Sequence, residues 1–237
     1  MALSLTKENY VLHRIHSITG VIPVGYYMVQ HLALNSFSIG GEAKFNGVID
    51  FFEGIPKHVL LAMEVLAIWL PLIFHAVYGV FIVSRAENNF FTTKYKWSHN
   101  RMFFLQRASG LVIFAFLIYH SLSTTGYKYA TGDVERLKFA AWHEFFSNPL
   151  WVLVYATGII ASSYHLGYGI WNFCIRWGIT VSEEAQTRIQ KASALIFVAL
   201  TLLGWGVIAG FIINKPGAAK TEAATAAIVQ PLSVATR

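Results

Sequence analysis

Four histidines recur at nearly even intervals along the chain: His31, His75, His120 and His165 are separated by 44, 45 and 45 residues. Each lies inside an apolar stretch long enough to cross a bilayer. Ionisable side chains at membrane depth are costly unless they line a site or have a partner, so a regular set of four indicates function. Four imidazoles can form two axial pairs, each around one cofactor.

The elements that must position these histidines are membrane helices. Of the 237 residues 55% are hydrophobic and only 13% charged, with a mean hydropathy of +0.50. Apolar runs, each near the ~20 residues that a membrane helix needs, cover residues 15–37, 59–83, 103–125, 149–174 and 192–213. The sequence predicts an all-α integral membrane protein with five transmembrane helices, the first four of which carry the histidines and form a bundle.

The predicted membrane domain covers residues 1–214. The longest loops, residues 38–58 and 126–148, are too short to bury a core of their own, although they could carry short helices or cover a site. Catalysis on a water-soluble substrate would therefore need another subunit. The tail, residues 215–237, is rich in Ala and Thr and is expected to be poorly ordered.

The net charge of +6 comes from basic residues in the loops between spans. Such residues help to set the orientation in the membrane, so nucleic-acid binding is not expected. The second and fourth connections hold the basic residues Arg85, Lys94, Lys96, Arg101, Arg176, Arg188 and Lys191. The positive-inside rule then predicts a cytoplasmic amino terminus and, after five spans, an outside carboxyl terminus. The first run has no cleavage site and is expected to stay as a helix. Cys174 is the only cysteine, which excludes internal disulfides and covalent C-x-x-C-H haem attachment.

The depths of the histidines predict how they pair. They lie 16, 16, 17 and 16 residues into their spans, which is about 24 Å along a helix axis. Because successive spans run in opposite directions, His31 and His120 fall toward the outer side, and His75 and His165 toward the inner side. The two layers are then roughly 18 Å apart in a ~30 Å core, which suits two stacked cofactors.

Haem fits such pairs best, because its apolar macrocycle can fill a bundle core while two histidines hold the iron. Two axial histidines leave no open iron position, so the predicted dihaem bundle carries electrons and does not activate oxygen. Direct binding of a metal, as in a transporter, is the competing interpretation. It would need ligands within about 2.1 Å of one ion, whereas these form two layers. An interhelical hydrogen bond would also explain a single histidine in the membrane. It would not explain why four histidines lie at matched depths.

Four sequence blocks carry a family resemblance: "HRIHSITGVIPVGYYMVQHLALNSF", "EVLAIWLPLIFHAVYGVFI", "FFLQRASGLVIFAFLIYH" and "YGIWNFCIRWGIT". They closely resemble the cytochrome b membrane subunit of Bacillus-type succinate:menaquinone oxidoreductases, the dihaem, single-anchor class of respiratory complex II. The resemblance covers roughly residues 8–213. Each block carries, or lies beside, one of the four histidines.

The resemblance implies a subunit of succinate dehydrogenase in the bacterial cytoplasmic membrane. Its partners would be a flavoprotein with FAD and the dicarboxylate site, and an iron–sulfur protein, both on the cytoplasmic side. Electrons would pass through two haem b groups, first on His75 and His165 and then on His31 and His120, to menaquinone near the outer face. Quinol:fumarate reduction in the reverse direction, a haem-free structural anchor and a homo-oligomer of the whole complex stay open.

Haem propionates need partners at the ends of the bundle, and charge-assisted bonds suit arginine. The candidates near the inner face are Arg14, Ser17, Gln106, Arg107 and Arg176. Ser17 follows from the resemblance, because similar cytochromes use the serine of the "HS" motif. Interfacial snorkelling is the alternative for Arg14 and Arg176. His13 and His16 are expected at the interface, not as ligands, and glycines such as Gly20 and Gly110 would let a ring or helix approach.

Glu64 is the outstanding acid, six residues into the second span and on the outer side. It is the candidate for proton exchange with quinol, and His58, Asp50 and Glu53 in the preceding loop could lead to the outside. A hydrogen bond to a neighbouring helix is the alternative. In related fumarate reductases an acid stands two residues before the fourth histidine. Here that position is Ser163, which favours the succinate oxidase pattern.

Overall fold

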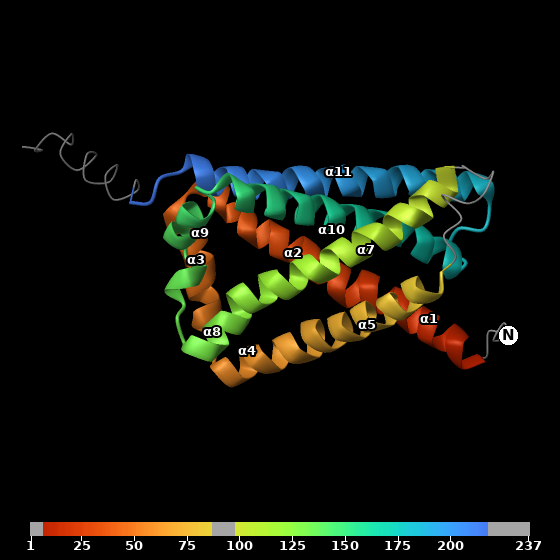
Figure 1. The fold of residues 1–237 in the computed structure, drawn as a ribbon, viewed down its shortest axis with the longest axis horizontal. Coiled ribbons are helices and arrows are strands. Elements are labelled where there is room, and N and C mark those ends of the chain that lie inside the picture. Colours follow the sequence, from red (N-terminus) through yellow and green to blue (C-terminus); the bar gives the residue numbers. More distant parts are fainter. Residues whose placement is uncertain (1–6, 87–97, 218–237) are drawn as a thin grey trace, which may run out of the picture.

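The fold is helical throughout the two ranges that the computed structural model describes, residues 7–86 and 98–217, where no strand occurs (Figure 1). Four segments are long and apolar enough to cross a membrane: Lys57–Arg85, Asn100–Thr131, Pro149–Arg176 and Glu183–Ile213. The prediction of an all-α, multi-pass membrane fold is confirmed.

Two of these segments are composite. The first consists of α4 (Lys57–Glu64), the π-helical turn η3 (Val65–Trp69) and α5 (Leu70–Arg85). The second consists of α7 (Ser98–Ser121), the π-helical turn η4 (Leu122–Gly126) and α8 (Tyr127–Thr131). The remaining two are the single helices α10 (Pro149–Arg176) and α11 (Glu183–Ile213).

The sequence predicts five spans, but among the described residues four segments have the length and hydropathy of a membrane span. The first run is one continuous helical segment of α1 (Lys7–Thr19), the π-helical turn η1 (Gly20–Gly25) and α2 (Tyr26–Asn35). It runs the length of the molecule beside the other segments (Figure 1). Polar side chains such as His16, Gln30 and His31 make it less apolar than the four candidate spans. Pro23 lies within η1. Because a proline cannot donate the regular helix hydrogen bond, the helix changes to a π-helical turn here.

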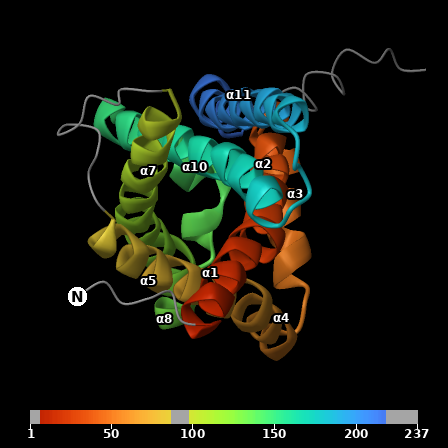
Figure 2. The same ribbon diagram turned by 90° about the vertical axis from the view of Figure 1, so that its right-hand side faces the viewer.

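Seen from its end, the bundle has α1, α5, α7 and α10 as a ring of neighbours, with α11 outside the ring against α10 and α2 (Figure 2). A Cβ atom on Gly167 of α10 would lie only 2.7 Å from the backbone oxygen of Ser193 in α11. Glycine there lets the two helices approach closely. The four segments that carry the histidines therefore form the bundle, as the sequence predicts, and the fifth segment packs on its side.

Short helices cover one end of the bundle, which we call the capped end; the other is the amino-terminal end (Figure 1). The cover consists of η2 (Ser36–Gly40), α3 (Glu42–Glu53), α8, η5 (Glu135–Leu137) and α9 (Phe139–Phe145). Phe45, Phe139 and Phe211 form its buried core. Both long loops thus carry short helices. Lys94, Lys96 and residues 218–237 of the expected tail lie outside the described residues.

Candidate functional site

The four histidines meet in two pairs inside the bundle. His31 of α2 faces His120 of α7 with ring centroids 5.8 Å apart and planes at 81°. His75 of α5 faces His165 of α10 with centroids 6.1 Å apart and planes at 90°. These are the two pairs that the alternating directions of the spans predict. The first pair lies toward the capped end and the second toward the amino-terminal end.

The separations agree with a shared iron in each pair. Because metal–nitrogen bonds to imidazole are about 2 Å long, two imidazoles on opposite sides of one ion have centroids roughly 6 Å apart. Both observed separations match that value. In the part of the chain that the structure describes, no three His, Cys, Asp or Glu side chains are grouped to bind a metal directly. The donor set therefore fits a cofactor with its own equatorial ligands, such as haem.

Backbone carbonyls orient both rings of the pair at the amino-terminal end. Nδ1 of His75 donates to the carbonyl of His16 at 2.8 Å, and Nδ1 of His165 donates to that of Gln106 at 3.1 Å. A carbonyl oxygen can only accept, so each ring carries its proton on Nδ1 and leaves Nε2 for a metal. Such bonds fix the tautomer and orientation of a ligating histidine.

Side chains contact the rings of the pair at the capped end. Nδ1 of His120 is 3.2 Å from the hydroxyl of Tyr155, which can donate or accept. Phe116 stacks on His120 with centroids 5.6 Å apart. Tyr27 lies 5.5 Å from His31 on the same helix. Ring orientation here depends on side-chain packing.

Two glycines allow close contact with the rings at the amino-terminal end. A Cβ on Gly20 would lie 2.6 Å from Nδ1 of His75, and one on Gly110 would lie 3.0 Å from Cε1 of His165. Real Cβ atoms are not found at the shorter of these distances, so Gly20 tolerates no side chain while His75 keeps its place. For these two glycines the structure shows close approach of a neighbouring helix through its histidine side chain, and approach of a cofactor ring stays a prediction.

His16 is part of this site, although the sequence suggested only an interfacial position. Its ring stacks on that of His75 with centroids 4.0 Å apart and planes at 9°. Among the described residues its buried Nδ1 atom has no hydrogen-bond partner. The signal in the sequence was helical spacing, because His16 precedes Gly20 by four residues and so shares its face.

Several residues expected to hold propionates gather at the amino-terminal end. The Arg14 guanidinium lies 4.4 Å over the Trp177 ring. Gln106 donates through Nε2 to the His165 carbonyl at 3.1 Å. Burial, together with the nearby charge of Arg176, lowers the pKa of His13. Ser17 and Arg107 are half-buried and have no ion pair or hydrogen bond from their side chains within the described ranges.

Buried polar atoms without partners mark the same region. Within the described residues they include Arg14 Nε, Gln106 Oε1, the Tyr78 hydroxyl and Trp177 Nε1. Buried polar groups are normally satisfied, so the unsatisfied donors on Arg14, Tyr78 and Trp177 indicate an acceptor that belongs to a ligand, whereas Gln106 Oε1 can only accept. Carboxylates are suitable acceptors. Tyr78 and Trp177 were missed from the sequence, because an aromatic residue near a span end is ordinary there.

Glu64 and His58 both lie at the capped end but differ in burial. Glu64 is half-buried at the end of α4, and its Oε2 accepts a 2.9 Å hydrogen bond from the Tyr129 hydroxyl of α8. His58 is exposed near the start of α4. Lys128 and Glu53 form an ion pair of 2.9 Å nearby. Ser163, two residues before His165, is fully buried.

Comparisons with known proteins agree with this arrangement. Residues 84–232 match the family model described as succinate dehydrogenase/fumarate reductase transmembrane subunit. The chain is also 34% identical over 206 residues to the succinate dehydrogenase cytochrome b558 subunit of Bacillus subtilis (strain 168). That match covers 87% of this chain and 98% of the relative.

Proposed function

Because this chain belongs to the succinate dehydrogenase/fumarate reductase family of membrane cytochrome b subunits, we propose that it anchors the enzyme and conducts electrons between its partner subunits and quinone. The observation that carries the proposal is the two facing imidazole pairs, at 5.8 and 6.1 Å. A haem b held by each pair would supply a one-electron carrier.

The chain's own residues hold and orient these groups. The carbonyls of His16 and Gln106 keep His75 and His165 in the tautomer that presents Nε2. The Tyr155 hydroxyl positions His120. At the amino-terminal end the propionate partners are Arg14, Ser17, Gln106, Arg107 and Arg176, of which Arg14 carries an unsatisfied buried donor, Nε.

The amino-terminal end faces the cytoplasm of a bacterial cell in this proposal, because the basic connections lie at that end. The flavoprotein, with FAD, and the iron–sulfur subunit dock there. Menaquinone reacts at the opposite, capped end, where electrons leave the last pair. Glu64 exchanges the accompanying protons with the outside, past the exposed His58, and the Tyr129 hydroxyl holds its carboxylate in place.

Succinate oxidation is the favoured direction. The family description covers both succinate dehydrogenase and fumarate reductase, but the relative that spans the chain is named as a succinate dehydrogenase subunit. The buried Ser163, in place of an acid, agrees with that direction.

A reduced-minus-oxidised spectrum of the purified chain or complex tests the proposal. We expect a b-type band and, by pyridine haemochrome assay, two haem b groups per chain. A preparation that assembles with its partners yet has neither would be a haem-free structural anchor, and the electron-transfer role would be lost.

A further inference from the structure

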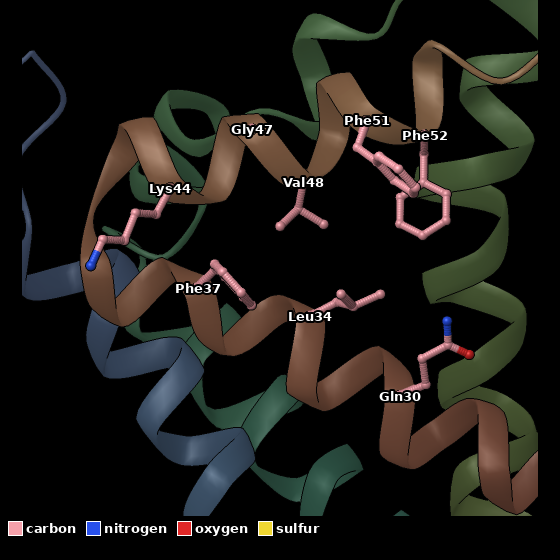
Figure 3. A pocket seen from close by; sticks show the side chains of 8 residues that line it. All are labelled: Gln30, Leu34, Phe37, Lys44, Gly47, Val48, Phe51 and Phe52. Atoms are coloured by element: carbon pink, nitrogen blue, oxygen red, sulfur yellow. The ribbon is translucent and has the colours of Figure 1, made fainter.

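A groove between α2 and α3 is a feature of the capped end that the proposed function does not yet use. Its volume is about 380 Å³, and its walls include Gln30, Leu34, Phe37, Gly47, Phe51 and Phe52 (Figure 3). Figure 3 shows Gln30 and Leu34 on one helix and Phe51 and Phe52 on the other, with side chains directed into the space between the two helices.

The fold holds the two walls of the groove apart by fixed contacts. Gly41, with a φ of +84°, makes the corner between η2 and α3, which runs across the end of the bundle (Figure 1). The hydroxyl of Ser38, just before that corner, donates to the Val207 carbonyl at 3.0 Å, and Asn214 donates to the carbonyl of Ser38. Phe45 of α3 is buried in the core of the cover. The groove is therefore a formed feature and not a gap left by a loose loop.

Gln30 and Lys44 are the polar residues that line this otherwise apolar groove, and Gln30 is the one on the α2 wall. Its side chain is exposed, and among the described residues it has no hydrogen-bond partner. An amide facing an apolar medium without a partner is costly, which points to a polar group supplied by a ligand. Gln30 directly precedes His31, so this group would lie within one helical turn of the pair at the capped end.

We propose that the groove binds the ring of an isoprenoid quinone. The Gln30 amide donates to one ring carbonyl, the phenylalanines cover the ring, and the isoprenoid chain leaves toward the lipid. The inference rests on the proposed function, in which quinone reacts at this end, and it adds the position of the ring and the residue that recognises it.

Size distinguishes the groove from the second cavity at the same end. The cavity beside Tyr129, Lys128 and Glu53 has a volume of about 150 Å³, and Phe52 separates it from the groove. Sites for small organic ligands usually measure roughly 300–1,000 Å³, which only the groove reaches. The Glu64 network then lies beside the quinone site, across Phe52.

The test measures binding of 2,3-dimethyl-1,4-naphthoquinone to the whole complex in lipid nanodiscs. A Cβ on Gly47 has no atom within 4 Å, so Gly47→Phe should fill the groove without disturbing the helix and raise the Kd at least tenfold. Gln30→Leu removes the amide and should weaken binding roughly tenfold. Leu153→Phe, a lipid-facing change near the same end of α10, should bind as the wild type does. An unchanged haem spectrum shows that each variant is folded.

The outcomes separate the groove from the wider function. If Gly47→Phe and Gln30→Leu bind the naphthoquinone normally while Glu64→Gln does not, the ring sits in the smaller cavity and the groove proposal is wrong. If Gly47→Phe removes a co-purifying phospholipid and leaves the Kd unchanged, Lys44 and the groove hold a lipid. If the wild-type complex binds no naphthoquinone although both haems are present, the groove proposal and the quinone step of the proposed function fail together.

Discussion

The two histidine pairs have the same ring spacing but are held in different ways. At the amino-terminal end two backbone carbonyls and a third, stacked histidine fix the rings. At the capped end a tyrosine hydroxyl and aromatic packing do so, beside a groove and a carboxylate. Backbone carbonyls belong to helices and move little, whereas side chains adapt. The comparison suggests a fixed relay at one end and a reactive, adjustable site at the other.

Replacing one of the four histidines with alanine should have the largest effect, and it tests whether the histidines are assigned to the right pairs. His120→Ala should abolish the same spectral component as His31→Ala, because their rings share one site. His75→Ala and His165→Ala should abolish the other component. A shared loss between His120→Ala and His75→Ala would contradict the pairing. Loss of both haems would report only failed assembly.

A methyl group on Gly20 should selectively disturb the pair at the amino-terminal end, His75 and His165. Gly20→Ala would place its Cβ against the His75 ring, and overpacking of this kind costs about 1–3 kcal/mol. We expect most of the haem at the amino-terminal end to be lost, as measured by redox titration of the spectrum. Gly206→Ala is the matched control, because its Cβ would meet its nearest neighbour at 3.5 Å, an ordinary contact.

Glu64→Gln should affect the reactive end without touching either pair. It keeps the size and the contact with Tyr129 but removes the titratable group, so quinone-linked turnover should fall roughly 10²-fold if Glu64 is the proton-transfer group. The haem content, and succinate oxidation by an artificial acceptor at the flavoprotein, should stay at wild-type levels. Normal quinone reductase activity would reduce Glu64 to a packing residue.

Tyr155→Phe should shift the potential of one haem only. The change removes the hydroxyl beside His120 Nδ1, a hydrogen bond worth about 1 kcal/mol, which corresponds to roughly 40 mV for a one-electron couple. With less electron density on the ring, the potential at the capped end should rise. A shift at the amino-terminal end instead would contradict the division between the two regions.

Replacing His16 should give the smallest effect, since its carbonyl remains in any variant. His16→Ala removes a ring that stacks on His75, an interaction of about 0.5–1.5 kcal/mol, and should broaden or shift the haem component at the amino-terminal end. His16→Phe keeps a stacked ring and should restore the component. If both variants match the wild type in redox titration, the stack has no positioning role.

Periodicity and depth were enough to predict the helical membrane fold, the bundle of the first four segments and the partners within each ring pair. Each rests on a local rule: about 20 apolar residues span a bilayer, and successive spans alternate in direction. The first span was the weak point, because its polar residues His16, Gln30 and His31 lower its hydropathy.

Only the tertiary structure decided what surrounds the histidines. The stacking of His16 on His75, the approach of Tyr155 to His120 and the bond from Tyr129 to Glu64 join residues 35 to 65 positions apart. Their existence depends on helix rotation and on where Gly20 and Gly41 let chains come close or turn, which no spacing along one helix reports. A sequence names the residues at a given depth, whereas packing between helices selects which of them touch.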